Sequence, residues 1–159
     1  MRTYVHLDGV PGVWFFSLDA SNALAVWGAR LAFGLPYCRA RMRLQAGHAD
    51  LHFTSTRVHP AAPPARFEAT WAGGAALPAP PPGSLDFFLV ERYCLYTVHG
   101  GRLYRVRIAH RPWPLRRVER LAFTSTMLES HGLPTPPEAP RPHAQGEPIR
   151  VGIWPPERL

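Results

Sequence analysis

The amino-acid sequence predicts a mostly β protein of the α+β class, in which a curved antiparallel sheet or barrel carries two or three short helices at its edge or mouth. Short segments of alternating apolar and polar residues recur along the 159 residues, and turn-forming glycines and prolines separate them. Capping residues open two short segments with helical character. The length suits a single domain, residues 1–159, that buries a core of its own.

The first segments of the chain predict a hairpin. Residues 3–7 and 13–18 flank a turn-rich loop that holds an Asp-Gly and a Pro-Gly step. The second segment is an almost continuous apolar run, which is typical of a strand covered on both faces.

A short helix is predicted within residues 18–38, between two strands, and the rest of the chain is organised around this unit. Side-chain oxygens that can cap its first turn belong to Asp19, Ser21 and Asn22. Residues at helical spacing on one face are Leu24, Trp27 and Leu31. Gly34 can adopt the left-handed conformation that ends a helix, and Pro36 keeps the helix from resuming.

The segment after this helix predicts a strand over residues 38–44 with a basic outer face. Its outward residues are Arg39, Arg41 and Arg43, and its inward residues are Cys38, Ala40, Met42 and Leu44. This strand and the hairpin of residues 93–108 are expected to be central in the sheet.

The rest of the chain predicts further strands, joined by turns. They are expected at residues 50–57, 66–71, 93–98, 103–108, 118–123 and 149–154. Ser84 opens a second helix that runs to Arg92, and residues 124–131 predict a helical turn closed by Gly132. Residues 73–83 are expected to be a loop, and residues 134–148 a proline-rich arm without a core-forming pattern.

Composition excludes several classes of protein. The net charge is +7, and all 18 basic residues are arginines. Arginine suits phosphate and carboxylate recognition, but an overall arginine bias in composition is the favoured explanation of the count, and the scattered positions argue against a nucleic-acid partner. No apolar run is long enough to span a membrane, and no signal peptide precedes the first strand.

Two cysteines inside apolar segments, Cys38 and Cys94, are expected to be buried thiols, which fits a cytoplasmic location.

Specific catalytic and cofactor motifs are absent. The chain has no C-x-x-C pair, no phosphate-binding loop, no G-x-S-x-G and no G-x-G-x-x-G. The eight histidines show no metal-ligand spacing, so neither a metal nor a cofactor is expected.

A ligand cavity is nevertheless predicted where the helices meet the strands. Its candidate residues are Trp14, Phe16, Arg30, Tyr37, Glu91, Tyr93 and Tyr96. In this interpretation Arg30 holds a carboxylate while tyrosines donate hydrogen bonds. The alternative is that Glu91 forms a structural ion pair with Arg30 or Arg92 and that the tyrosines belong to the core.

Several longer motifs resemble a known family. They are P-G-V-W-F-F-S-L-D-A, A-R-L-A-F-G-L-P-Y, P-G-S-L-D-F-F-L-V-E-R-Y-C-L-Y-T, G-G-R-L-Y-R and H-R-P-W-P-L. The chain thereby resembles the YqjF-like family of uncharacterised bacterial proteins, whose fold is similar to the acetoacetate decarboxylase-like superfamily. The resemblance implies a closed antiparallel β-barrel with a central ligand cavity.

The same resemblance excludes the superfamily's decarboxylase chemistry. Those decarboxylases carry a Schiff-base lysine just after a Gly-x-Pro step, which matches Gly34 to Pro36 here. Tyr37 and Cys38 stand where the lysine pair would be, and the chain has no lysine. Neither side chain can form an imine with a ketone, so Schiff-base decarboxylation would require the N-terminal amine in place of the lysine, and nothing in the sequence argues for that.

Members of that family usually carry a further N-terminal stretch ahead of the residues that match Arg2. Its lack would leave an open edge at residues 3–7, from which a homodimer is expected. Three functions follow: binding of a small carboxylate or keto acid, a scaffold whose arm at 134–148 reaches a partner, and polyanion binding through Arg39, Arg41 and Arg43.

Overall fold

The protein is described by a computed structural model that covers residues 1–138, 140, 143–145 and 147–159. Its described strands form two six-stranded sheets. The first contains β1 (Arg2–Leu7), β2 (Val10–Phe15), β7 (Cys94–His99), β8 (Arg102–His110), β11 (Val151–Ile153) and β12 (Glu157–Arg158). The second contains, in spatial order, β10 (His143–Gln145), β9 (Leu115–Ser125), β6 (Arg66–Ala76), β5 (Asp50–Arg57), β4 (Tyr37–Ala46) and β3 (Leu18–Ala20).

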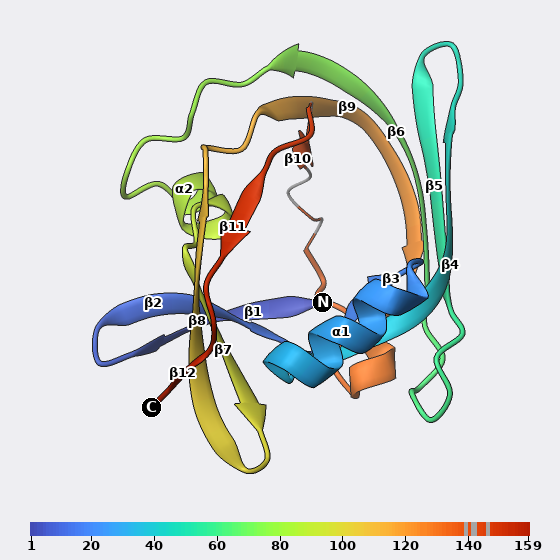
Figure 1. Ribbon diagram of the computed structural model, residues 1–159. Helices are drawn as coiled ribbons and strands as arrows, with labels where there is room; N and C mark the ends of the chain where they lie inside the picture. The colour runs from blue at the N-terminus through green and yellow to red at the C-terminus, as the bar shows by residue number, and fades with distance from the viewer. Residues whose placement is uncertain (139, 141–142, 146) are drawn as a thin grey trace.

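Together the sheets curl into an open half-barrel, with the long strands β6 and β9 arching over one side (Figure 1). The helices α1 (Ala23–Phe33), α2 (Leu85–Val90) and the 3₁₀ turn η1 (Glu129–His131) are short. The predicted fold class, mostly β with a curved sheet and short helices, is confirmed.

The N-terminal hairpin forms with a tighter turn than the sequence predicts. Asp8 and Gly9 both have positive φ, 50° and 76°, and form a two-residue connection between β1 and β2. The Pro-Gly step that was expected in the loop lies inside β2 instead, because β2 pairs with β1 from Val10 onward. On its other side β2 pairs in parallel with β7.

The predicted helix between two strands is confirmed as α1, and the strand after it as β4, but the strand expected over residues 13–18 is divided, since β2 ends at Phe15 and the short strand β3 begins at Leu18. The Asn22 side chain accepts a hydrogen bond from the Ala25 N–H at 3.1 Å, and Gly34 ends the helix at φ 62°. Its predicted apolar face is not covered: Leu24, Trp27 and Leu31 are 84%, 69% and 63% exposed. Val26 is buried instead, because the helix turns its opposite side to the sheet.

The second sheet is an antiparallel ladder through β4, β5, β6 and β9. β4 shows the predicted alternation over its first half, with Cys38 and Ala40 buried and the arginines exposed. Leu44, which was expected to point inward, is exposed near the end of the strand.

The predicted loop at 73–83 is partly wrong, since β6 continues to Ala76 with irregular pairing to β9. Backbone pairing to β9 stabilises this glycine-rich segment as a strand although its side chains are small.

The core lies on the first sheet, below the end of α1. Its buried cluster consists of Val13, Leu35, Leu95 and Val106. Tyr37, Phe33 and Ile108 are among the side chains that pack against this cluster. The core therefore ties the loop after α1 to the β2–β7–β8 layer and fixes where α1 ends.

The remaining local predictions are largely confirmed. The Ser84 side chain accepts from the Phe87 N–H and caps α2, and Gly100 and Gly101 form the β7–β8 turn at φ 55° and 71°. Gly132 closes η1. Within the arm predicted at 134–148, β10 pairs with β9, while residues 139, 141–142 and 146 lie outside the described part. Neither helix in the described residues is long and apolar enough to cross a membrane.

Candidate functional site

The structure distributes the seven predicted cavity residues over three pockets rather than one. Trp14 and Tyr96 line a pocket of about 150 Å³, and Glu91 and Tyr93 line another of about 380 Å³. Phe16 and Arg30 line a third, of about 240 Å³. The ring of the seventh residue, Tyr37, packs against the core.

The environment of Glu91 is a hydrogen-bonded cluster and not an ion pair. Its carboxylate accepts hydrogen bonds from the Tyr93 hydroxyl and, at 3.4 Å, from the Trp113 N–H. Arg92 donates to the main-chain carbonyl of Glu91 at 2.7 Å and not to its carboxylate, and its guanidinium lies 4.1 Å from the centroid of the Phe88 ring. The expected pairing of Glu91 with Arg30 or Arg92 does not occur among the described residues. The hydrogen bond to Glu91 raises the pKa of Tyr93 to about 12.

Half of the residues that line the pocket of Arg30 have polar or reactive side chains, and we call it the Arg30 pocket. It lies where the β2–β3 connection, the last turn of α1, the start of β4, the end of β5 and η1 converge (Figure 1). Its polar or reactive lining residues are Ser17, Arg30, Cys38, Arg57, His59 and His131.

A buried ion pair builds one wall of the Arg30 pocket. Arg57, at the end of β5, donates from Nε to Asp19 Oδ1 at 2.9 Å, and the side chains are 1% and 7% exposed. Its other nitrogens donate to Ser17 Oγ at 2.9 Å and to the Pro63 carbonyl at 3.1 Å. Asp19 neutralises this guanidinium, and the three partners hold it in place.

His131 joins the same wall as a neutral ring. Its Nε2 lies 2.9 Å from Ser17 Oγ. Because Arg57 already donates to that oxygen, the hydroxyl proton is free to be donated to Nε2, which places the ring proton on Nδ1. Burial lowers the pKa of His131, and the charge of Arg57 lowers it further. The ring therefore carries one N–H donor at neutral pH.

Arg30 supplies the charge of the pocket. One of its terminal nitrogens donates to the Tyr37 carbonyl at 2.8 Å, and within the described part of the chain it has no acidic partner. None of the described lining residues is acidic. Burial raises the pKa of the Cys38 thiol, so this group is neutral as well. The site thus carries an uncompensated positive charge.

A second histidine adds another donor. His59 Nδ1 accepts the Arg39 N–H at 3.3 Å, so Nε2 is the ring nitrogen that carries a proton. The Arg30 pocket therefore offers Arg30, His59 and His131 as donors, and its chemistry favours a small ligand with several acceptor oxygens.

Sequence reasoning missed Ser17, Arg57, His59 and His131 as site residues. No motif links them, because Ser17 lies 40 positions from Arg57 and 114 from His131. Two signals were present. Ser17 is the polar residue within the apolar run of residues 13–18, and Arg57 takes an inward position in the alternation of β5. A polar or charged residue at a buried position indicates a partner elsewhere in the fold.

The structure provides no metal-binding cluster in the residues that it describes, since no three His, Cys, Asp or Glu side chains gather there. Both cysteines are buried and unpaired, as predicted.

Comparison with known proteins places this geometry in context. A family model, DUF2071, described as an uncharacterized conserved protein, matches residues 1–148. The uncharacterized protein YqjF of Bacillus subtilis (strain 168) is 38% identical over 143 residues, which cover 90% of this chain and 58% of that protein. A structure titled "Structural Studies of Acetoacetate Decarboxylase" matches with a TM-score of 0.55 and 16% identity, over 99% of this chain and 66% of the other. The chain thus spans less than two thirds of either protein.

Proposed function

Because the chain belongs to the DUF2071 family of uncharacterized conserved proteins and has a fold similar to that of acetoacetate decarboxylase, we propose that its Arg30 pocket binds a small carboxylate, preferably a keto acid. The similarity in fold to acetoacetate decarboxylase supports the choice of keto acids, since acetoacetate is a keto acid. The polar lining of the pocket is what carries the proposal.

The observation that carries most weight is the state of Arg30. Its hydrogen bond to the Tyr37 carbonyl orients the guanidinium at the pocket and leaves the remaining N–H groups for a ligand. A planar guanidinium binds a carboxylate through two parallel hydrogen bonds. Arg30 would thus bind the carboxylate, as the sequence predicts. The further hydrogen-bond donors would be histidines and not the predicted tyrosines.

The size and donors of the pocket support a keto acid. The volume of about 240 Å³ lies below the roughly 300–1,000 Å³ of pockets for drug-sized ligands. The N–H groups of His59 and His131 match the acceptor lone pairs of a ketone oxygen. The Phe16 ring, 5.8 Å from the His131 ring between centroids, adds an apolar wall.

An imine on a lysine side chain is not available to these 159 residues, which contain no lysine. Cys38 lines the Arg30 pocket beside Pro36, but a neutral thiol cannot act as the amine that imine formation requires. We therefore propose binding for this pocket and propose no reaction in it.

The test is a thermal-shift and calorimetry panel of pyruvate, acetoacetate, benzoate and inorganic phosphate. A ligand at 100 times its Kd stabilises the protein by about 2.7 kcal/mol. Arg30→Gln is expected to weaken keto-acid binding by about 10-fold or more, because a hydrogen bond to a charged group contributes about 1.5–3 kcal/mol.

The matched control is Arg102→Gln, which removes the same charge from the exposed β7–β8 turn. This variant should bind as the wild type does. If no carboxylate binds, or if Arg30→Gln and Arg102→Gln lose affinity equally, the proposed function is wrong.

A further inference from the structure

The second sheet has an open edge at β4 that no described strand covers. β3 pairs with β4 at Tyr37, Cys38 and Arg39 and ends at Ala20. β4 continues to Ala46, and on its other side β5 pairs with it along the whole length from Ala40. Most of β4, residues 40–46, is therefore an edge strand.

The hydrogen-bonding direction along this edge follows from the pairing at Arg39. The Arg39 carbonyl accepts from the Val58 N–H at 2.8 Å, and the Arg39 N–H donates to His59, so both groups face the β5 side. Since successive residues of a strand direct their backbone groups to opposite sides, Met42 and Leu44 present theirs to the open edge. These are the groups to which another strand can bind.

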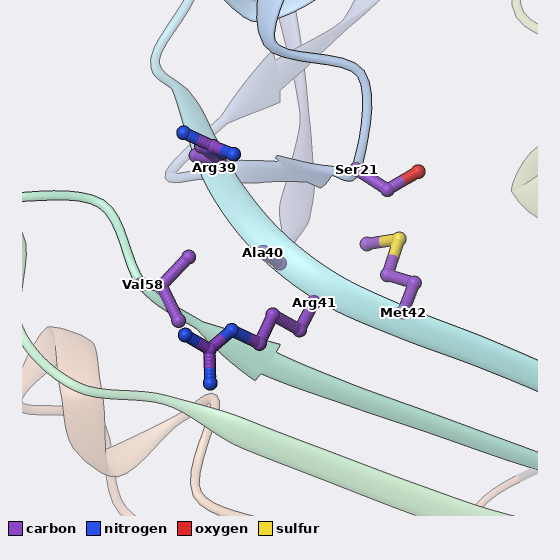
Figure 2. A pocket seen from close by; sticks show the side chains of 6 residues that line it. All are labelled: Ser21, Arg39, Ala40, Arg41, Met42 and Val58. Carbon is purple, nitrogen blue, oxygen red and sulfur yellow. The ribbon is translucent and has the colours of Figure 1, made fainter.

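The two faces of the open edge differ in chemistry. Arg39, Arg41 and Arg43 project from one face, and their guanidinium groups have no ion-pair or hydrogen-bond partner among the described residues. Figure 2 shows Arg41 and Met42 leaving β4 on opposite sides. The residues in this view line a depression of about 480 Å³ that reaches from Ser21 to Val58.

We propose that the open edge of β4 binds an extended acidic segment of another protein by strand addition. Main-chain hydrogen bonds would join it to Met42 and Leu44. Side chains of an added strand alternate between the faces, so acidic residues would lie beside Arg41 and Arg43 and apolar residues beside Met42 and Leu44. The partner is thus a segment in which acidic and apolar residues alternate.

Charge argues against a second copy of this chain as the occupant. In an antiparallel pair centred on Met42, Arg41 of one copy would lie opposite Arg43 of the other, and like charges in direct cross-strand pairs are destabilising. The arginines thereby protect the edge from self-pairing while they favour an acidic strand.

A nucleic acid fits the open edge less well. It would satisfy the arginines but would leave the backbone groups of Met42 and Leu44 and the exposed Leu44 side chain without partners. This site is independent of the Arg30 pocket, and neither proposal depends on the other.

The test measures binding of a fluorescent hexapeptide that alternates glutamate and valine, by polarization. Two further peptides carry N-methyl groups on all glutamate or on all valine amides. Strand addition predicts that one methylated set loses binding and the other retains it, because only alternate amides of an added strand face β4. The set that loses binding also reports whether the added strand is parallel or antiparallel.

Variants of the protein test the same contacts. Arg41→Gln with Arg43→Gln is expected to weaken binding about tenfold, through loss of two cross-strand charge pairs. Arg102→Gln with Arg158→Gln removes equal charge from other exposed positions and should have little effect. Met42→Pro removes one outward N–H and should abolish binding while circular dichroism shows that the sheet is retained.

The outcomes are distinguishable even if the proline variant fails to fold. If both methylated peptides bind as tightly as the parent, strand addition is wrong. A mixed-sequence single-stranded oligonucleotide of the same net charge as the peptide serves as a competitor. If it displaces the peptide and binds with the same affinity, the surface binds polyanions in general, and the proposal is wrong.

Discussion

At the scale of single residues, Arg57 is a charged side chain that is buried and is stabilised by partners distant in the sequence. It takes an inward position on β5, where an unpaired charge would be costly. Asp19, Ser17 and the Pro63 carbonyl satisfy three of its nitrogens. Since removal of one partner from a buried ion pair costs about 3–5 kcal/mol, these contacts hold the wall of the Arg30 pocket rigid.

His131 makes stability depend on pH. Its pKa is lowered in the folded state from an ordinary value of 6.5, so the unfolded chain takes up a proton first as the pH falls. The free energy of unfolding should therefore be highest above pH 6.5 and decrease as the pH falls from 6.5 through the folded-state pKa.

Urea unfolding of the wild type and of His131→Gln between pH 5 and 7.5 checks this, and the variant should show the shallower decrease. His48→Gln, at an exposed position, is the control and should follow the wild type. Parallel pH profiles for wild type and His131→Gln would contradict the assignment.

At the scale of elements, the end of α1 determines where the pocket lies. Gly34 takes φ 62°, and its N–H donates to the Arg30 carbonyl, so the chain can turn directly into Pro36 and β4. A Cβ at Gly34 would lie 2.6 Å from the Cβ of His99 on the neighbouring hairpin. This glycine is required both by its conformation and by the close approach of β7.

Gly34→Ala is expected to destabilise the protein by about 2 kcal/mol or more, since the left-handed conformation alone costs about 1–2 kcal/mol for an L-residue. The matched control lies in the same helix. A Cβ at Gly28 meets nothing within 4 Å, so Gly28→Ala should stabilise by about 0.5–1 kcal/mol.

Chemical denaturation measures both free energies of unfolding. Equal shifts of the same sign for the two variants would show that the end of α1 imposes no special constraint.

At the scale of the whole molecule, the two sheets form a half-barrel that ends in open strands. β1 is an edge of the first sheet, as the sequence analysis expects for residues 3–7. The apolar face of α1, defined by Leu24, Trp27 and Leu31, is a second exposed surface. These two surfaces are separate, so association through each can be tested by itself.

The homodimer remains a prediction, and we place its contact at β1. Light scattering across a range of protein concentrations should show a dimer that Thr3→Lys weakens, because charge on an edge strand opposes pairing. Trp27→Glu alters the α1 face and should leave the dimer intact. A monodisperse monomer at working concentration would contradict this prediction, and loss of the dimer with Trp27→Glu alone would move the contact to α1.

The sequence by itself determined the class of fold, most of the longer strands and where both helices begin, because these depend on local signals. Asn22 and Gly34 bound α1, Ser84 caps α2, and the paired glycines turn the β7–β8 hairpin, all within a few residues of the atoms that they bond. The absence of lysine from these 159 residues likewise excludes an imine on a lysine side chain without any structure.

Only the tertiary structure decided which residues share a pocket. It separated Glu91 from Arg30 and brought Ser17, Arg57 and His131 together, although no local pattern relates them. It also left the apolar face of α1 exposed, and it placed β6 where glycine predicted a loop. The physical reason is that strand pairing and side-chain packing join residues distant in sequence, whereas caps, turns and alternation report only on neighbours.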